Sequence, residues 1–236
     1  MDIKKFVCVF DFETTGIPRR SKTHKNGYYP PEELTAYDTS RAVSLAWVLY
    51  DGFNKIYKKS NFIIIPDNFV SSPGALKVHG ITDEYAKHNG VEIQNVLNEF
   101  YYDLKECNTL VAYNVYFDYN ILLSECYRYN NRELSKLVTQ MNKNRDVKCA
   151  MKMSSDHLKN DPNFKPRSKY MPSLQDSYRY LFNKPEFNTS HDALDDTIRC
   201  GDIYYEIRKR IIQKEMDDYE KIRVNGRLMT INIHIY

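Results

Sequence analysis

The feature that most constrains this chain is a set of three strand-like segments in its first third, the first of which ends in two acidic residues. The sequence predicts strands over residues 4–12, 41–50 and 55–65, because each run is rich in apolar residues and turn residues separate the runs. Strands so close together in sequence favour an antiparallel meander. Such a sheet must bury its apolar faces against other elements.

A helical pattern follows the predicted meander from Ser72 onward. Apolar residues spaced three and four apart predict helices, and a short apolar run predicts a strand. The expected elements are a helix over residues 91–105, a central strand over 109–113, helices over 117–128 and 174–182, and a late helix that Ser190 caps and that runs from about residue 191 past Ile211. A strand followed by a helix predicts the α/β fold class.

Composition excludes several broad classes of protein. The chain has 236 residues, of which 42% are hydrophobic and 28% charged, with only 8 Gly and 9 Pro, so it is neither fibrous nor low in complexity. Its five cysteines are scattered, which gives neither a disulfide framework nor a closely spaced zinc site. No run has the roughly 18 apolar residues of a membrane span or the shorter apolar stretch of a secretory signal. We expect an intracellular protein, cytoplasmic or nuclear, with no membrane partner.

The domain organisation is predicted to be one domain over residues 1–215 with an extension over 216–236. Within the domain, residues 17–40 form a basic insertion loop that is too long for a hairpin turn. In the extension, Asn225-Gly226 between residues 221–224 and the segment from Arg227 predicts a β-hairpin, because Asn-Gly suits a type I′ turn. This hairpin either packs on the domain itself, which we favour, or forms a homodimer edge.

Asp11 and Glu13 are the first candidate functional residues. They lie two apart at the end of a strongly apolar strand, so both carboxylates point to one face of the sheet while Phe10 and Phe12 occupy the other. Two like charges side by side are costly to bury unless something neutralises them. Oxygen-only ligands would favour Mg²⁺ or Mn²⁺ over zinc.

Two later segments carry further acidic residues at predicted helix starts. Asp118 follows the central strand, and His191 and Asp196 open the late helix. Each has a simpler structural explanation, since a carboxylate in a first helical turn complements the helix dipole and a histidine at a helix start is often exposed. Asp192 and Asp195 are interpreted as such dipole partners.

Together, however, these segments resemble the three motifs of the DnaQ-like, DEDDh class of 3′-to-5′ exonucleases. The motifs are Asp11-x-Glu13 with Thr14, Thr15 and Gly16 after it, then Asn114-x-x-Phe117-Asp118, then His191-x4-Asp196. Residues 78–82 resemble the family's His-Gly-Ile segment, and residues 146–151 and 173–182 resemble its later helical region. The resemblance covers about residues 4–207.

The resemblance implies both a fold and a chemistry. The fold would be RNase H-like, a mixed five-stranded sheet flanked by helices, with its first three strands antiparallel. Two Mg²⁺ or Mn²⁺ ions would be bridged by Asp11, with Glu13 and Asp196 completing the first site and Asp118 acting on the second through water. His191 would be the general base. The reaction would release nucleoside 5′-monophosphates from the 3′ end of DNA or RNA by a two-metal mechanism.

Two groups of residues are predicted to bind the single-stranded 3′ end. By resemblance, the terminal nucleotides would contact residues of the first two motifs and of the His-Gly-Ile segment, namely Thr14, Thr15, His79, Gly80, Ile81, Asn114 and Phe117. From their charge, Arg19, Arg20, Lys165 and Arg167, in two stretches poor in acidic residues, would line the path of the strand. The alternative for these four is that they form solvated faces.

Two other functions remain open on the sequence. One is a proofreading subunit of a DNA polymerase, which has the same chemistry with a different partner. The other is a catalytically inactive nucleic-acid-binding module, against which we count the presence of all four carboxylates and the histidine. The choice between DNA and RNA stays open, because it depends on how the site treats the 2′ hydroxyl.

Overall fold

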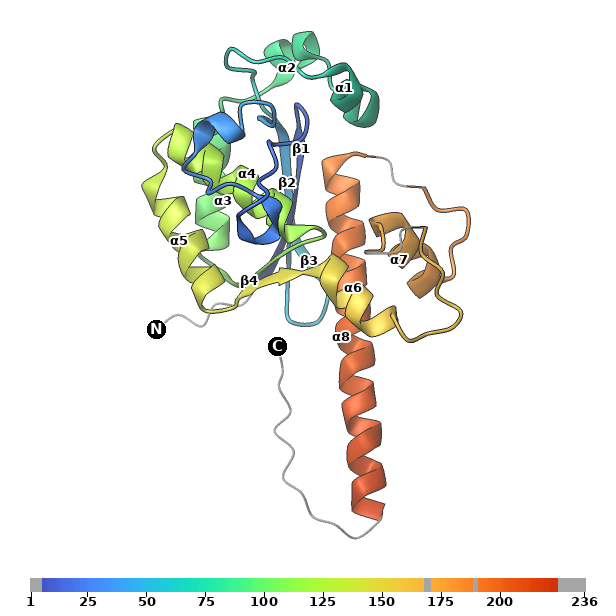
Figure 1. Ribbon diagram of the computed structural model, residues 1–236. Helices are drawn as coiled ribbons and strands as arrows, with labels where there is room; N and C mark the ends of the chain where they lie inside the picture. The colour runs from blue at the N-terminus through green and yellow to red at the C-terminus, as the bar shows by residue number, and fades with distance from the viewer. Residues whose placement is uncertain (1–5, 168–170, 189–190, 225–236) are drawn as a thin grey trace.

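A five-stranded sheet forms the centre of the molecule in the computed structural model, which describes residues 6–167, 171–188 and 191–224 (Figure 1). The strand order is β3-β2-β1-β4-β5. The strands are β1 (Phe6–Thr14), β2 (Ala42–Tyr50), β3 (Ile56–Ile63), β4 (Cys107–Ala112) and β5 (Val147–Cys149). The mixed α/β sheet that the sequence predicted is therefore confirmed.

The sheet changes direction at its central strand. β1 pairs antiparallel with β2, and β2 pairs antiparallel with β3. On its other edge β1 pairs parallel with β4, which in turn pairs parallel with β5. Parallel neighbours need long crossover connections, and the helices supply them. The carboxyl ends of the parallel strands β1, β4 and β5 therefore lie along one edge of the sheet.

Helices cover both faces of the sheet (Figure 1). The helices are α1 (Pro73–His79), α2 (Asp83–Asn89), α3 (Ile93–Leu104), α4 (Val115–Arg128), α5 (Arg132–Lys143), α6 (Ala150–Leu158), α7 (Leu174–Phe182) and α8 (Ala193–Val224). The insertion loop contains two single turns of 3₁₀ helix, η1 (Lys25–Gly27) and η2 (Leu34–Ala36). Helix α5 and strand β5 were not predicted as elements, because α5 is strongly polar and β5 is very short.

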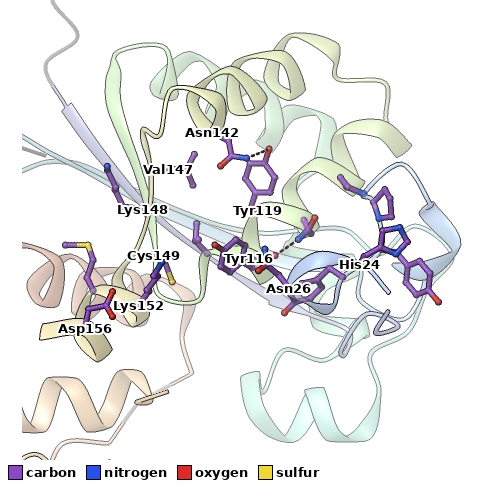
Figure 2. Close-up of a pocket in the computed structure, with 17 residues that line it drawn as sticks. His24, Asn26, Tyr116, Tyr119, Asn142, Val147, Lys148, Cys149, Lys152 and Asp156 are labelled. Carbon is purple, nitrogen blue, oxygen red and sulfur yellow. Dashed lines mark hydrogen bonds between the residues drawn. The ribbon is translucent and has the colours of Figure 1, made fainter. Parts of the chain in front are cut away.

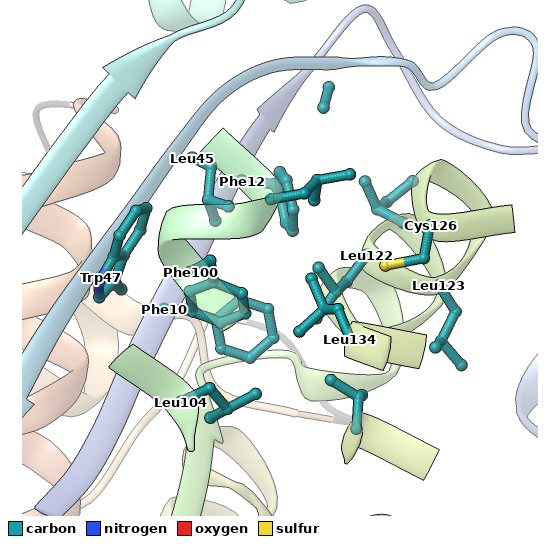
Figure 3. Packing of buried hydrophobic residues seen from close by; sticks show 14 of the residues in the cluster. Phe10, Phe12, Leu45, Trp47, Phe100, Leu104, Leu122, Leu123, Cys126 and Leu134 are labelled. Atoms are coloured by element: carbon teal, nitrogen blue, oxygen red, sulfur yellow. The ribbon is translucent and has the colours of Figure 1, made fainter. Parts of the chain in front are cut away.

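Alternation along β1 divides the core into two clusters. Cys8, Phe10 and Phe12 belong to the cluster that α3, α4 and α5 cover (Figure 3). Val7 and Val9 belong to the cluster that α6, α7 and α8 cover. Because successive side chains of a strand point to opposite faces, the residues of β1 that follow Val9 at odd positions lie on the α8 face. The strand thus turns its acidic residues toward α8.

Helix α8 corrects the prediction for the end of the chain. It crosses the expected boundary between residues 215 and 216 and ends at Val224. Residues 221–224, predicted as the first arm of a hairpin, are therefore helical, because extending an existing helix avoids the cost of nucleation. The predicted turn at residues 225–226 and the second arm from residue 227 lie outside the described residues, and so does a dimer edge built on that arm.

The start of α8 also differs from the sequence prediction. The helix begins at Ala193, and the carboxylate of Asp192 accepts a hydrogen bond of 3.0 Å from the backbone N–H of Asp195. Asp192 is thus a capping residue, while Ser190, the predicted cap, lies outside the described residues.

Among the helices described, none combines the length and hydrophobicity that crossing a bilayer requires.

The packing of α8 on the sheet makes Gly201 sensitive to substitution. A Cβ atom at this position would lie 2.6 Å from Cζ of the buried Tyr50 ring. We expect Gly201→Ala to lower the free energy of unfolding by about 1–3 kcal/mol, because a packed core resists added volume. Urea denaturation measures this.

The matched control is Gly74→Ala, another helical glycine. Its new Cβ atom would meet nothing nearer than 4.0 Å, so the change should be neutral or stabilising by up to about 1 kcal/mol. Equal effects of the two substitutions would contradict the close contact between α8 and β2.

Candidate active site

Three acidic side chains converge at the end of β1. Asp11 and Glu13 project from the strand toward α8, and Asp118 lies in the first turn of α4. The Oδ1 atom of Asp118 accepts a hydrogen bond of 3.2 Å from the backbone N–H of Phe12, between the two strand carboxylates in sequence. Asp118 is only 3% exposed. Its position is therefore fixed by β1 itself.

The N-terminal end of α8 brings a fourth carboxylate and a histidine. Asp196 lies in the first turn of the helix, with its side chain mostly buried. Its Oδ2 atom is 4.0 Å from Nδ1 of His191, whose side chain is half exposed. His191 has a left-handed backbone conformation with φ of 51°. The histidine and the carboxylate predicted to flank one cleft thus lie side by side.

Burial and mutual repulsion disfavour the charged forms of these acids. Burial, and then the charges of Asp118, Glu13 and Asp196, hold the pKa of Asp11 well above its usual range. Burial and Asp196 raise the pKa of Glu13 to about 8. Burial raises the pKa of Asp118 to about 7 despite the Phe12 hydrogen bond, and burial with Asp195 and Asp192 raises that of Asp196 to about 7. Four like charges therefore share one site.

The donor chemistry of this cluster fits a divalent cation. All donors are carboxylate oxygens, which suit Mg²⁺ or Mn²⁺, and a cation would relieve the repulsion that raises the pKa values. Oδ1 of Asp196 is buried and has no hydrogen-bond partner among the described residues. In the part of the chain that the structure describes, however, no three acidic, histidine or cysteine side chains are arranged to hold a metal ion. The donors have converged without forming a finished coordination shell.

A buried ion pair ties the end of β1 to β2 and α4. Arg41 donates from Nε and Nη2 to the two carboxylate oxygens of Glu125, at 2.9 and 3.2 Å, and both side chains are almost completely buried. The backbone N–H of Arg41 donates to Oγ1 of Thr15 at 2.9 Å, and its carbonyl accepts the Thr15 N–H at the same distance. Glu125 lies about two turns after Asp118 on α4, so the pair holds α4 against the strand that carries the other acids.

Thr14 and Thr15, predicted to contact substrate, are buried and bonded within the protein. Thr14 Oγ1 donates to the Gly16 carbonyl at 2.8 Å, and Thr15 accepts from Arg41 as described. The Thr15 carbonyl also accepts the backbone N–H of Ser72 at 3.0 Å. Both threonines therefore shape the turn after Glu13 and join it to the segment before α1.

His79, Gly80 and Ile81 form the end of α1, which Figure 1 shows at the same end of the sheet as the turn after β1. Gly80 adopts the left-handed conformation, with φ of 71°, that ends the helix. Nδ1 of His79 accepts the Ile81 N–H at 3.0 Å, so the proton lies on Nε2. Nε2 is buried with no partner among the described residues, and burial lowers the pKa of His79. The Nε2–H of His79 is therefore a neutral hydrogen-bond donor that has no acceptor among the described residues.

The insertion loop folds back on itself beside α4. Arg20 and Tyr28 form an antiparallel bridge, and the Arg20 guanidinium lies 4.0 Å from the centre of the Tyr28 ring. Arg19 stacks in the same way on Tyr29, at 4.8 Å. Asn114 lies close enough to the Tyr28 hydroxyl to influence its pKa. Both arginines are thus exposed cations held on aromatic rings.

The remaining predicted substrate contacts differ in their surroundings. Asn114 is exposed immediately before α4, whereas Phe117 is half buried against the main core. Lys165 is exposed. Arg167 pairs with Asp176 at 3.1 Å and also contacts Gln175 at the start of α7. Asn114 and Phe117 thus precede Asp118 at the start of α4, while Arg167 anchors its loop to α7.

Sequence reasoning missed two parts of this site. It did not single out the Arg41–Glu125 pair, because partners 84 residues apart carry no local signal. It also did not single out Tyr28, whose pKa is raised by burial and which lies near Asn114 and Asp118. The dense aromatic residues beside the arginines of the insertion loop were the available signal.

Comparison with known proteins gives the class of this chain. A family model described as exonuclease, RNase_T, matches residues 8–204. The chain therefore belongs to this exonuclease family, whose members have the DnaQ-like, RNase H-like fold seen here. A search of curated protein sequences gives no significant match.

Solved structures show the same fold at low sequence identity. Exonuclease I of E. coli, in complex with a dT13 oligonucleotide, aligns with a TM-score of 0.63 and 18% identity over 91% of this chain and 43% of that one. Exonuclease I of Methylocaldum szegediense gives 0.60 and 18% over 87% and 41%, and cell-death related nuclease 4 (CRN-4) gives 0.60 and 16% over 89% and 64%. The chain thus spans less than half the length of the exonuclease I structures.

The raised pKa values predict how stability depends on pH. In the unfolded chain these carboxyls titrate near pH 4, so between about pH 4 and 8 the metal-free folded protein binds more protons than the unfolded one. Its free energy of unfolding should therefore fall as the pH rises from about 6 to 8. Asp118→Asn removes one of the mutually repelling charges, so it should flatten this dependence and stabilise the metal-free protein at pH 8.

Urea denaturation in EDTA at several pH values provides the measurement. The matched control is Asp38→Asn, which removes an exposed carboxylate far along the chain from the cluster and should leave the slope unchanged. A metal-free protein that gains stability from pH 6 to 8 would contradict the assigned repulsion.

Proposed function

We propose that this protein is a metal-dependent 3′-to-5′ exonuclease of the DEDDh type that releases nucleoside 5′-monophosphates. The observation that carries the proposal is the convergence of Asp11, Glu13, Asp118 and Asp196, all with raised pKa values, beside His191. Membership of the exonuclease family over residues 8–204 supports the same reaction class.

Asp11, Glu13 and Asp196 are proposed to hold one Mg²⁺ or Mn²⁺ ion, and Asp11 with Asp118 a second. When bound, such ions supply an activated water and stabilise charge on the phosphate and the leaving oxygen. Asp118 keeps its place through the Phe12 hydrogen bond. The unbonded Oδ1 of Asp196 is the donor most readily available, because no protein group has to be displaced from it.

His191 is proposed to take the proton from the attacking water. Imidazole has an ordinary pKa near neutrality, which suits a general base. Its half-exposed ring lies beside the acidic cluster, with Nδ1 4.0 Å from Oδ2 of Asp196. Asp196 would then stabilise the imidazolium that forms.

The proposed substrate is the single-stranded 3′ end of DNA or RNA. Exonuclease I structures with the same fold are complexes with oligonucleotides such as dT13 and dA16. In this chain His79, at the end of α1, and Asn114 and Phe117, at the start of α4, are proposed to contact the terminal nucleotide. The exposed Arg19, Arg20 and Lys165 offer charge for the backbone, and Arg167 does so in competition with Asp176.

Substitution of the acidic residues tests the proposal directly. Asp11→Ala and Asp118→Ala should abolish turnover of a 5′-labelled oligonucleotide while the fold is kept, since each removes a proposed metal ligand. His191→Ala should reduce the rate severely, by a factor of roughly 100 or more for the loss of a general base. The matched control is Asp195→Ala, in the same turn of α8, which should retain most of the activity.

Parental rates in all three variants would refute the site. Tight oligonucleotide binding without any hydrolysis by the parent protein would instead indicate a binding module. A denaturing gel of 5′-labelled products, with thermal unfolding of each variant, separates these results.

Metal dependence and polarity form a separate test. EDTA should stop hydrolysis, and Mg²⁺ or Mn²⁺ should restore it, because the carboxylates need a counter-charge. A substrate with a blocked 3′ end should resist digestion, whereas one with a blocked 5′ end should be shortened stepwise. Full activity in chelator, or digestion from the 5′ end, would overturn the mechanism. Matched DNA and RNA oligonucleotides in the same assay decide between the two sugars.

A further inference from the structure

A large groove opens beside the acidic cluster and has no assigned role. Its volume is about 830 Å³, near the upper end of the range of roughly 300–1,000 Å³ that is typical of ligand pockets. One wall is the insertion loop, the floor is the start of α4, and the other wall is β5 with the start of α6. Figure 2 shows Tyr116 between His24 and Asn26 on one side and Cys149 and Lys152 on the other.

The groove begins where the acidic cluster ends. Tyr28, which lines the groove, lies near both Asn114 and Asp118, because both residues influence the pKa of its hydroxyl. The opposite wall is fixed to the same place, because the Tyr113 carbonyl accepts the Met151 N–H at 2.8 Å. A chain with its end among the carboxylates would therefore enter this groove within a short distance.

Aromatic rings and cations line the groove together. Its tyrosines are Tyr28, Tyr29, Tyr116 and Tyr119, and its lysines are Lys148 and Lys152. Tyr116 is 40% exposed, and Lys152 is exposed. The acidic residue in the lining, Asp156, pairs with Lys159 at 3.6 Å. Rings offer surfaces for bases to stack on, and lysines attract phosphates, which is how proteins bind single strands without reading sequence.

Charge gives the groove a role beside the proposed metal site. The bound ions would neutralise the carboxylates at the scissile phosphate, and the lysines on the neighbouring wall offer positive charge for the phosphates that precede it. The groove therefore complements the charge of a longer single strand.

We propose that this groove, formed by residues 24–31, the start of α4 and the segment 147–156, binds the bases of the single strand that precede the terminal nucleotide. The inference rests on the proposed exonuclease function and extends it to a binding surface that the insertion loop creates. Stacking on Tyr116 and charge from Lys152 carry most of the affinity. The groove would make the protein prefer long single strands over dinucleotides.

The test measures binding against oligonucleotide length. Fluorescence anisotropy follows 5′-labelled oligothymidylates of about two to about twelve nucleotides, in the Asp118→Asn background so that substrate is not consumed. Tyr116→Ala should weaken binding of the longest strand about tenfold, the effect of one lost stack, and weaken the shortest much less. Tyr116→Phe keeps the ring and should keep the affinity. Lys152→Gln should weaken long strands and lower the salt dependence of binding by about one phosphate contact.

Matched controls lie away from the groove. Tyr102→Ala on α3 and Lys136→Gln on α5 each remove an exposed ring or cation and should leave binding unchanged. The inference is overturned if Tyr116→Ala and Lys152→Gln bind every length within twofold of the background, or lose the same factor at all lengths.

A hydrolysis assay on the parent protein separates this inference from the proposed function. If the parent trims 3′ ends but the groove variants bind like the background, the groove proposal fails and the function stands. If the parent hydrolyses nothing but the length-dependent loss persists, the function fails and the groove stands as a single-strand site.

Discussion

Repulsion among four carboxylates at the end of β1 is the interaction on which the rest of this structure depends. Burial raises the pKa of each acid, and the neighbouring charges add to the effect for Asp11, Glu13 and Asp196. A protein gains nothing in stability from such an arrangement, so the fold must hold it in place by other means. In the proposed mechanism a bound divalent cation relieves the same repulsion, which links the instability of the site to its proposed chemistry.

The surrounding structure holds the acids from three directions. Alternation along β1 turns two of them toward α8, while the Phe12 N–H fixes Asp118 from the other side of the sheet. The buried Arg41–Glu125 pair holds α4 against the strands and bonds the turn after Glu13 through Thr15. Removing one partner of such a pair leaves an uncompensated buried charge, so this network stabilises the site although it contains no acid of the cluster.

The insertion loop and the fifth strand extend the site beyond the acids. The loop carries tyrosines to one side of α4, and β5 with α6 carries lysines to the other. Neither wall bears a proposed metal ligand. In the proposed complex their aromatic and basic side chains would contact the single strand while its end lies among the carboxylates. Recognition of strand length and hydrolysis of the terminal nucleotide would then belong to different surfaces of one domain.

The sequence by itself determined strands β1 to β4, helices α3, α4, α7 and α8 and the identity of the acidic residues, because period-two and helical patterns and short motifs are local signals. It failed at residues 221–224, where a turn signal at Asn225-Gly226 was extended into a strand although the preceding helix continues. Only the tertiary structure decided that Asp192 caps α8, that Arg41 pairs with Glu125, and that Tyr28 and Tyr116 share a groove. Tertiary packing selects the partners in those contacts. Such packing produces no repeating pattern in a single sequence from which the contacts could be predicted.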